Sequence, residues 1–166
     1  MLRLIFLLLL ACLFATQASA DLPAAEGTVL LTIIGKIRHT NRLELAEFDQ
    51  QLLESLEQQE VTTHNPWFVG NNTYSGPLMR ALVEAVGADK NSNMRIISLN
   101  GFVAEIPVSD SLDYDLILAL KKNGRLQRIR DRGPLFTIYP FDEHPHLNTE
   151  MHYNRSVWQV KTIEFF

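Results

Sequence analysis

The alternation of apolar and polar positions predicts a domain of short strands with two main helices. Residues 28–37 are β-branched and almost continuously apolar, which is typical of a buried strand. Gly35 within this run indicates a bulge or a close backbone approach. Asn41, with Glu44 three positions later, resembles a helix-capping arrangement. A first helix is therefore expected, with an apolar face formed by Leu45, Phe48, Leu52 and Leu56.

A second helix is predicted after the polar run 71–76. Pro77 suits the first turn of a helix and Gly87 suits its end. The apolar face of this helix would be formed by Leu78, Leu82 and Ala85.

Two Asn-Gly pairs, at positions 100–101 and 123–124, are strong hairpin signals. They separate four strand-like segments, namely 95–99, 102–106, 116–120 and 126–129. Several strands with two helices in one domain predict an α+β fold built on a mixed, largely antiparallel sheet.

The N-terminus has the three parts of a secretory signal: a basic start at Arg3, an apolar run over 4–14, and small residues that end at Ala20. We predict cleavage after Ala20 and a mature, periplasmic domain of residues 21–166. Two alternatives stay open. Cys12 lies in a stretch that loosely resembles a lipobox, and an uncleaved anchor is the weaker option because the run barely reaches the ~20 residues that a membrane helix needs.

The chain carries 15 basic and 19 acidic residues, a net charge of −4. Such a balance argues against nucleic acid as a partner, because phosphates require clustered Lys and Arg. The nearest basic cluster, within 121–132, is interrupted by a turn and is expected to decorate a hairpin. No later segment is apolar for long enough to span a bilayer, so no direct membrane insertion is expected after signal cleavage.

Cys12 is the single cysteine and falls inside the predicted signal. The mature protein is therefore expected to contain no thiol, which excludes disulfides, thiolate metal ligands and cysteine nucleophiles. A divalent ion could use imidazole and carboxylate ligands instead. The candidates, Asp142, His144, His146 and His152, lack a strict ligand spacing, so a solvated loop is preferred and no metal is predicted.

Two apolar segments, 133–140 and 155–163, bracket a polar loop near the C-terminus. Apolar strands with polar and aromatic groups at their ends favour a ligand pocket. Segment 60–67 adds a strand that runs into a proline-directed turn. Ordinary core packing is the alternative explanation for the tryptophans in these segments, Trp67 and Trp158.

The order and spacing of these segments resemble the sulfite-oxidase-like molybdopterin-binding fold in its small, single-domain periplasmic form. The most telling parts are Gly-Pro-Leu-Phe-Thr-Ile-Tyr-Pro at 133–140 and Ser-Val-Trp-Gln at 156–159, together with Leu-Asn-Gly-Phe at 99–102. The resemblance covers nearly all of the mature chain. It implies a single-domain sulfite-oxidase-like fold over residues 21–166.

Enzymes of that family hold molybdenum through a cysteine thiolate on a loop after a strand. This sequence places Thr63-His64-Asn65 in the corresponding region, where a hydroxyl or imidazole would poorly replace the soft ligand. The resemblance thus implies a pterin-holding scaffold, and the missing cysteine predicts that this scaffold has neither molybdenum nor enzyme activity. The alternative is a molybdopterin-dependent periplasmic oxidoreductase with non-cysteine metal ligation.

The small branch of the family resembles the PruR-type regulators. These bind reduced pterins and control a membrane-bound enzyme that makes or degrades cyclic diguanylate, which links them to biofilm regulation. The resemblance implies a tetrahydropterin-type ligand for this chain. It also implies, as partner, the periplasmic domain of an inner-membrane cyclic-diguanylate cyclase or phosphodiesterase.

A pterin needs an aromatic or apolar clamp on its faces and hydrogen-bonding groups on its rim. Trp158 ranks first, since it follows the segment that matches the family's cofactor loop. Asn100 is equally explained by its turn, and Arg132 by an ion pair with Asp131. The full set of predicted ligand-binding residues is Trp158, Tyr139, Trp67, Phe102, Asn100, Thr63, His64, Arg132, Arg155 and Ser156, the last two because the family's cofactor phosphate lies near that segment.

Overall fold

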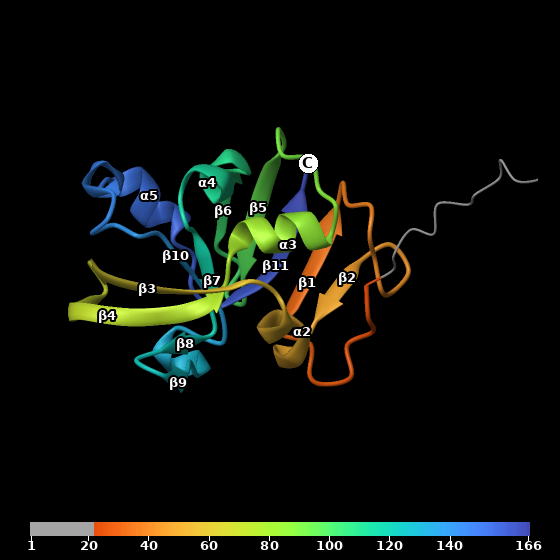
Figure 1. Cartoon of the computed structure of the whole chain (residues 1–166), viewed down its shortest axis with the longest axis horizontal. Helices are drawn as coiled ribbons and strands as arrows, with labels where there is room; N and C mark the ends of the chain where they lie inside the picture. The colour runs from red at the N-terminus through yellow and green to blue at the C-terminus, as the bar shows by residue number, and fades with distance from the viewer. Residues whose placement is uncertain (1–21) are drawn as a thin grey trace, which may run out of the picture.

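A mixed sheet of five strands forms one end of the domain, in the order β2-β1-β11-β5-β6 (Figure 1). The structure, a computed structural model, describes residues 22–166, so the predicted signal segment and its cleavage site lie outside the described residues. The strands are β1 (Leu31–Gly35), β2 (Ala46–Phe48), β5 (Asn93–Ser98), β6 (Val103–Pro107) and β11 (Val160–Phe165). β1 and β11 run parallel, and the other neighbours in this sheet are antiparallel.

A long hairpin extends from this sheet toward the opposite end of the molecule (Figure 1). Its strands, β3 (Gln58–Asn65) and β4 (Phe68–Pro77), form a second sheet with β8 (Lys121–Lys122) and β9 (Arg125–Leu126). β7 (Ile117–Ala119) and β10 (Phe136–Ile138) form a separate antiparallel pair. The helices of the described chain are α2 (Gln50–Ser55), α3 (Met79–Ala85), α4 (Ser109–Asp113) and α5 (Glu150–Arg155), with 3-10 turns η2 (Ile129–Asp131) and η3 (Pro145–Leu147).

Two clusters of buried side chains hold these layers together. The larger joins residues of the five-stranded sheet, such as Ile33 and Ile163, to Met79 and Leu82 of α3. The smaller lies between the β3–β4 hairpin and the β7–β10 pair, and consists of Val61, Tyr74, Leu78, Ile117, Ala119, Phe136 and Ile138. Each large apolar side chain buried in this way stabilises the fold by about 1.5–3 kcal/mol. The smaller cluster forms the floor of the aromatic site described below.

The N-terminal half of the first predicted helix is wrong. The Asn41 carboxamide does not cap a helix, because it bonds both the N–H and the carbonyl of Glu47, each at 2.8 Å, and closes a loop. Residues 46–48 then pair with β1 as β2. The helix itself, α2, begins after Asp49, whose carboxylate accepts the Leu52 N–H at 2.9 Å. This bond is the foremost reason that the pKa of Asp49 lies below its ordinary value.

The second predicted helix is confirmed, but its start is not at Pro77. Pro77 is the last residue of β4, and α3 begins two residues later. The polar run 71–76 is also strand, with Asn72, Tyr74 and Gly76 on its buried face. Asn and Gly are poor strand formers, so local propensity does not reveal the pairing of β4 with β3.

Both predicted turns exist, with different geometry, but the second does not join the predicted strands, since of segment 126–129 only Leu126 lies in a strand, β9. At positions 100–101 only Gly101 has a positive φ, of 84°, and its N–H donates to the Ser98 carbonyl at 3.1 Å. The loop that joins β5 to β6, residues 99–102, is therefore not a two-residue type I′ turn. Asn123 and Gly124 both have positive φ, 50° and 74°, as a type I′ turn requires. That turn joins β8 to β9, whereas the predicted strand 116–120 becomes β7 and pairs with β10.

The architecture confirms the predicted fold class. The described chain is one α+β domain of mixed, mostly antiparallel sheets with few helices. Within residues 22–166, none of the helices has both the length and the apolar character that a bilayer crossing demands.

Candidate ligand-binding site

Aromatic rings meet edge to face where the β3–β4 hairpin approaches α5 and the start of β11. The Trp67 ring centroid lies 5.6 Å from Phe136, 6.0 Å from Tyr153 and 5.7 Å from Trp158. Such T-shaped pairs each contribute about 0.5–1.5 kcal/mol beyond their area burial. Phe136 is fully buried, whereas both tryptophans are half-buried. The cluster therefore has a rigid floor and an open face.

Backbone hydrogen bonds fix Trp158 against β10. The Thr137 N–H donates to the Val157 carbonyl at 2.9 Å, and Trp158 itself bridges to Phe136. The next residue, Gln159, turns the chain with a φ of 53° and donates its N–H to the Arg132 carbonyl at 2.9 Å. The two segments that bracket the C-terminal loop thus lie side by side.

Trp67 is held by the turn that closes the β3–β4 hairpin. The Asn65 carboxamide accepts the Trp67 N–H at 3.2 Å and donates to the Tyr74 hydroxyl at 2.8 Å. Burial raises the pKa of Tyr74 above its ordinary value, so the phenol stays neutral and accepts this bond. A buried hydrogen bond therefore positions the indole.

A pocket of about 120 Å³ opens beside these rings. It is lined by Trp67, Phe102, Tyr153, Asn154, Ser156, Val157 and Trp158. The Ser156 hydroxyl donates to the His152 carbonyl at 3.0 Å, and the Tyr153 hydroxyl donates to Asn148 at 3.0 Å. The exposed Asn154 carboxamide has no hydrogen-bond partner within residues 22–166. The pocket is thus an aromatic slot with one free amide at its rim.

Two cations border the aromatic cluster. The Arg132 guanidinium lies 4.2 Å from the Trp158 ring centroid and 5.4 Å from that of Phe68. The Lys122 ammonium lies 3.3 Å from the Phe68 ring centroid. Cation–π contacts of this kind contribute about 0.5–2 kcal/mol, more where water is excluded. Desolvation is the main reason that the pKa of Lys122 is lowered, and the charge of Arg132 adds to it.

Half of the predicted site residues gather here. Trp67, Phe102, Ser156 and Trp158 line the pocket, and Arg132 lies over the Trp158 ring. The sequence prediction missed Tyr153, Asn154 and Val157. A signal for the first two exists, since Thr149 precedes them in the sequence pattern of a helix N-cap and does cap α5.

Thr63, His64 and Asn100 lie outside the pocket lining. The Thr63 hydroxyl is buried and accepts the Asp142 N–H at 3.1 Å. The His64 imidazole pairs with the Asp142 carboxylate, which also accepts the His64 N–H at 3.1 Å. Asn100 bonds the Ser98 hydroxyl and the Phe102 N–H inside its own turn. Each side chain is therefore engaged in holding a loop.

Tyr139 and Arg155 belong to a buried polar network instead. The Tyr139 side chain has no exposed surface, and its hydroxyl donates to the Asp110 carboxylate at 2.7 Å. Arg155 donates to the same Asp110 oxygen at 3.0 Å. Burial raises the pKa of Tyr139 well above its ordinary value, and the Asp110 charge adds to the effect. This network connects α5 to α4, so both residues hold α5 in place and do not line the pocket.

Lowering the pH is expected to destabilise the domain through His152, which packs beside this network. Burial lowers its pKa from the ordinary 6.5, so the folded state resists protonation. Below about pH 6.5 the unfolded chain binds the proton more readily, and stability is lost as the pH falls. Urea unfolding between pH 7 and pH 5 measures this. A His152→Gln variant should show a flatter pH dependence, and an unchanged slope would contradict the assignment.

Thr63 and His64, which were predicted to take the place of the cysteine ligand of sulfite-oxidase-like enzymes, do not fit a molybdenum ligand set. Thr63 already uses its hydroxyl, since it also donates to the His64 carbonyl at 3.2 Å, and the imidazole of His64 faces a carboxylate. Neither group is the soft thiolate that this metal prefers. Across residues 22–166, no three His, Cys, Asp or Glu side chains come together in a metal-binding arrangement.

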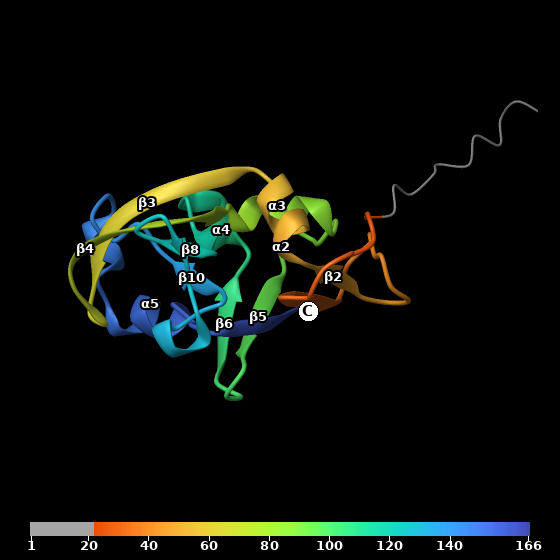
Figure 2. The same cartoon turned by 90° about the horizontal axis from the view of Figure 1, so that it is seen from below.

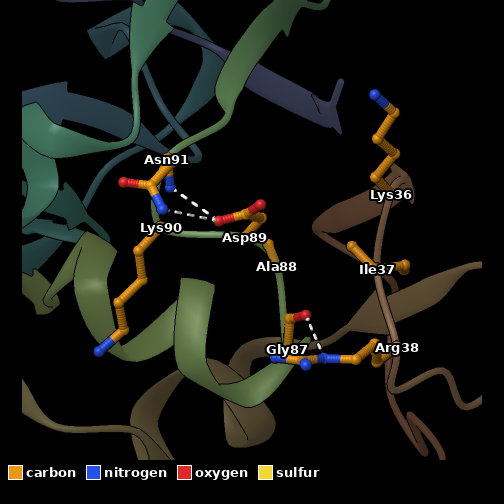
Figure 3. A pocket seen from close by; sticks show the side chains of 8 residues that line it. All are labelled: Lys36, Ile37, Arg38, Gly87, Ala88, Asp89, Lys90 and Asn91. Atoms are coloured by element: carbon orange, nitrogen blue, oxygen red, sulfur yellow. Dashed lines mark hydrogen bonds between the residues drawn. The ribbon is translucent and has the colours of Figure 1, made fainter.

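Larger hollows exist elsewhere on the surface. One of them, of about 720 Å³, lies between residues 36–38 and the 87–91 loop (Figure 3). Arg38 there donates its Nε to the Gly87 carbonyl at 2.9 Å, and Asp89 bonds the neighbouring Asn91. No aromatic side chain lines it, so it offers no stacking surface for a flat ligand. The smaller aromatic pocket is the better candidate site.

No family model and no curated protein matches this chain. Among solved structures it is similar to the sulfane dehydrogenase SoxCD from Paracoccus pantotrophus, with a TM-score of 0.63 and 15% sequence identity. The similarity covers 88% of this chain and 40% of that chain, so the chain spans less than half of that structure. A likeness at this identity shows the fold, and it supports the sulfite-oxidase-like fold that the sequence predicted.

Proposed function

We propose that this protein is an exported pterin-binding protein without a molybdenum centre. In this proposal it relays pterin availability to a membrane-bound cyclic-diguanylate cyclase or phosphodiesterase. The observation that supports ligand binding most directly is the aromatic pocket between Trp67 and Trp158. The sulfite-oxidase-like fold supports a pterin as the ligand class.

The pocket offers the chemistry that a pterin requires. The two half-buried indoles and the Phe102 ring give apolar surface for a flat bicycle, and offset stacking adds about 0.5–1.5 kcal/mol per ring. The Asn154 carboxamide can both donate and accept, as the aminopyrimidinone edge of a pterin does. Arg132, at 4.2 Å from Trp158, supplies donors for a ring carbonyl.

The size of the pocket supports a sensing role. At about 120 Å³ it is smaller than the 300–1,000 Å³ of sites that enclose drug-sized ligands. A bound bicycle would therefore leave one edge at the surface, where a partner protein could contact it. A ligand changes the affinity of the protein for its partner only if the ligand binds the free protein and the complex with different affinities.

Titration of a tetrahydropterin into the mature protein tests the ligand. Trp67 and Trp158 are the two tryptophans of the chain, and both line the pocket. Quenching of intrinsic fluorescence therefore reports on this site, and calorimetry gives the stoichiometry. Saturable binding of one pterin per chain supports the proposal, whereas no binding at high micromolar concentration defeats it.

Trp158→Ala is expected to weaken tetrahydropterin binding about five- to sixtyfold while the domain stays folded. The substitution removes one stacking face and the cation–π contact to Arg132, together worth about 1–2.5 kcal/mol. Trp158 is half-buried, so the loss of packing should be tolerated. The measurement is calorimetric titration of the variant beside wild type, with circular dichroism as the folding check.

Phe166→Ala is the matched control, because this half-buried aromatic contacts Arg95 and does not line the pocket. It should leave pterin affinity unchanged. Unfolding of Trp158→Ala would mean that the indole is core, where truncation costs about 3–5 kcal/mol. Stoichiometric molybdenum in protein purified from its native periplasm would favour the oxidoreductase alternative.

A further inference from the structure

Apolar side chains are exposed beside the pocket, at the end of the β5–β6 hairpin. Leu99, Phe102 and Val103 are 46%, 49% and 45% exposed, and Ile129 in η2 is 61% exposed. Gln159 joins the two turns, because it donates its Nε2 to the Ile129 carbonyl at 2.8 Å and accepts the Leu99 N–H at 2.9 Å. The four exposed residues, Leu99, Phe102, Val103 and Ile129, are called the apolar tip. Exposed apolar side chains on neighbouring turns are typical of interaction surfaces.

Basic residues flank Ile129 of this tip in the sequence. Six of the 15 basic residues of the chain fall within residues 121–132, where Asp131 is the single acid. Five of the six, Lys122, Arg125, Arg128, Arg130 and Arg132, are called the basic rim below. Arg128 pairs with Asp131 at 2.8 Å and Arg130 approaches it at 3.9 Å, while Arg125 has no ion-pair partner in the described chain. The rim therefore keeps a net positive charge in a protein whose total is −4.

The tip projects from the molecule. Figure 2 shows the turn between β5 and β6 at the far end of two strands that point away from the rest of the domain. A projecting apolar turn flanked by arginines suits a flat, anionic surface, because the apolar groups enter the interface while the guanidinium groups meet lipid phosphates. A protein partner would instead need a concave, acidic counterpart.

We propose that the apolar tip and the basic rim together dock this protein on an anionic membrane surface. Phe102 belongs to both the tip and the pocket lining, so docking brings the pocket mouth to the membrane. This inference goes beyond ligand binding and does not require a pterin.

Co-sedimentation with sucrose-loaded vesicles tests the proposal on the mature, pterin-free protein. Vesicles of phosphatidylcholine with 30% phosphatidylglycerol are compared with phosphatidylcholine alone, in 50 mM and 500 mM NaCl. We expect at least tenfold stronger binding to the anionic vesicles at low salt, and loss of that preference at high salt because the Debye length shortens. Equal binding to both vesicle types, or none to either, overturns the proposal. In the second outcome the tip is a surface for a protein partner.

Paired variants separate charge from apolar insertion. Arg128→Glu with Arg130→Glu should reduce binding to the anionic vesicles to the level of the neutral ones, and Leu99→Ser with Val103→Ser should weaken it at least fivefold. The control is Lys36→Glu with Lys90→Glu, which makes the same change in net charge at the hollow of Figure 3. Residues 87–91 of that hollow come just before the first residue of β5, whereas the apolar tip follows its last residue. Equal losses in the control would show that net charge alone drives binding and would overturn the proposal.

Folding of every variant is checked by circular dichroism and by urea midpoint. Should the double serine variant unfold, Ile129→Ser replaces it, since that side chain is the most exposed of the tip. The pterin titration is run separately without vesicles, so failure of membrane docking and failure of pterin binding are distinguishable.

Discussion

Asp110→Ala is expected to destabilise the domain by about 3 kcal/mol, because it leaves the partly buried charge of Arg155 without its partner and the buried Tyr139 hydroxyl without its acceptor. The Asp110 side chain is 10% exposed, and its Oδ2 accepts bonds from both Tyr139 and Arg155. Without the carboxylate, the 21% exposed Arg155 side chain loses its counter-ion and the buried phenol loses its acceptor. Because the network ties α5 to α4, we also expect α5 to lose order and pterin affinity to fall.

Urea unfolding of Asp110→Ala beside wild type measures the effect. Asp131→Ala is the matched control, because Asp131 also pairs with an arginine, Arg128, at 2.8 Å but with 65% and 41% exposed side chains. An exposed pair of this kind contributes about 0–1 kcal/mol. Equal destabilisation by the two substitutions would show that the Asp110 network carries no special weight.

This network also shows why two of the predicted ligand residues belong elsewhere. Tyr139 was predicted as an aromatic clamp and Arg155 from the family resemblance, and the segments of both do lie beside the pocket. Their side chains turn to Asp110, which is 29 positions from Tyr139 and 45 from Arg155. A contact across that distance in the chain leaves no local pattern, so the sequence could predict where the segments lie but not where these side chains point.

The predictable part of the site is the part fixed by local pattern. The hairpin after β5 follows from Asn-Gly, and it brings Phe102 to the pocket. The apolar segment around Trp158 follows from its composition, and the bridge to Phe136 then positions the indole. The short helix α5 interrupts a polar, histidine-containing loop that shows no apolar periodicity, so Tyr153 and Asn154 were missed.

The same contrast applies to the fold. The strand pattern of residues 28–37 contains β1, which is buried on alternate positions. The helix start predicted at Asn41 was wrong because a carboxamide forms hydrogen bonds with the backbone of a loop as readily as with a helix N-terminus. Here the backbone partner is Glu47. The α+β class was nevertheless predictable, since it depends on the number and order of elements and not on their ends.

Gly35→Ala is expected to be among the most damaging single substitutions in the described chain, at about 2–5 kcal/mol. Gly35 ends β1 with a φ of 89°, a conformation that costs a residue with a side chain about 1–2 kcal/mol. An added Cβ would also collide with the backbone carbonyl of Phe165, the residue paired with Gly35 across the parallel strands. Backbone cannot move aside as a side chain can, and overpacking of this kind costs about a further 1–3 kcal/mol.

Alanine substitutions at two other glycines distinguish the cost of the positive φ from the cost of the steric collision. Gly101→Ala shares the positive φ, at 84°, but its Cβ would meet open space, so a loss of only about 1–2 kcal/mol is expected. Gly76→Ala has no positive φ, but its Cβ would collide with the Leu118 carbonyl, so packing alone should destabilise it. Urea midpoints of the three variants give the order. If Gly35→Ala lowered the free energy of unfolding no more than Gly101→Ala does, β1 and β11 could move apart at Gly35 at no cost in stability. The close backbone approach that the sequence predicted would then contribute nothing to stability.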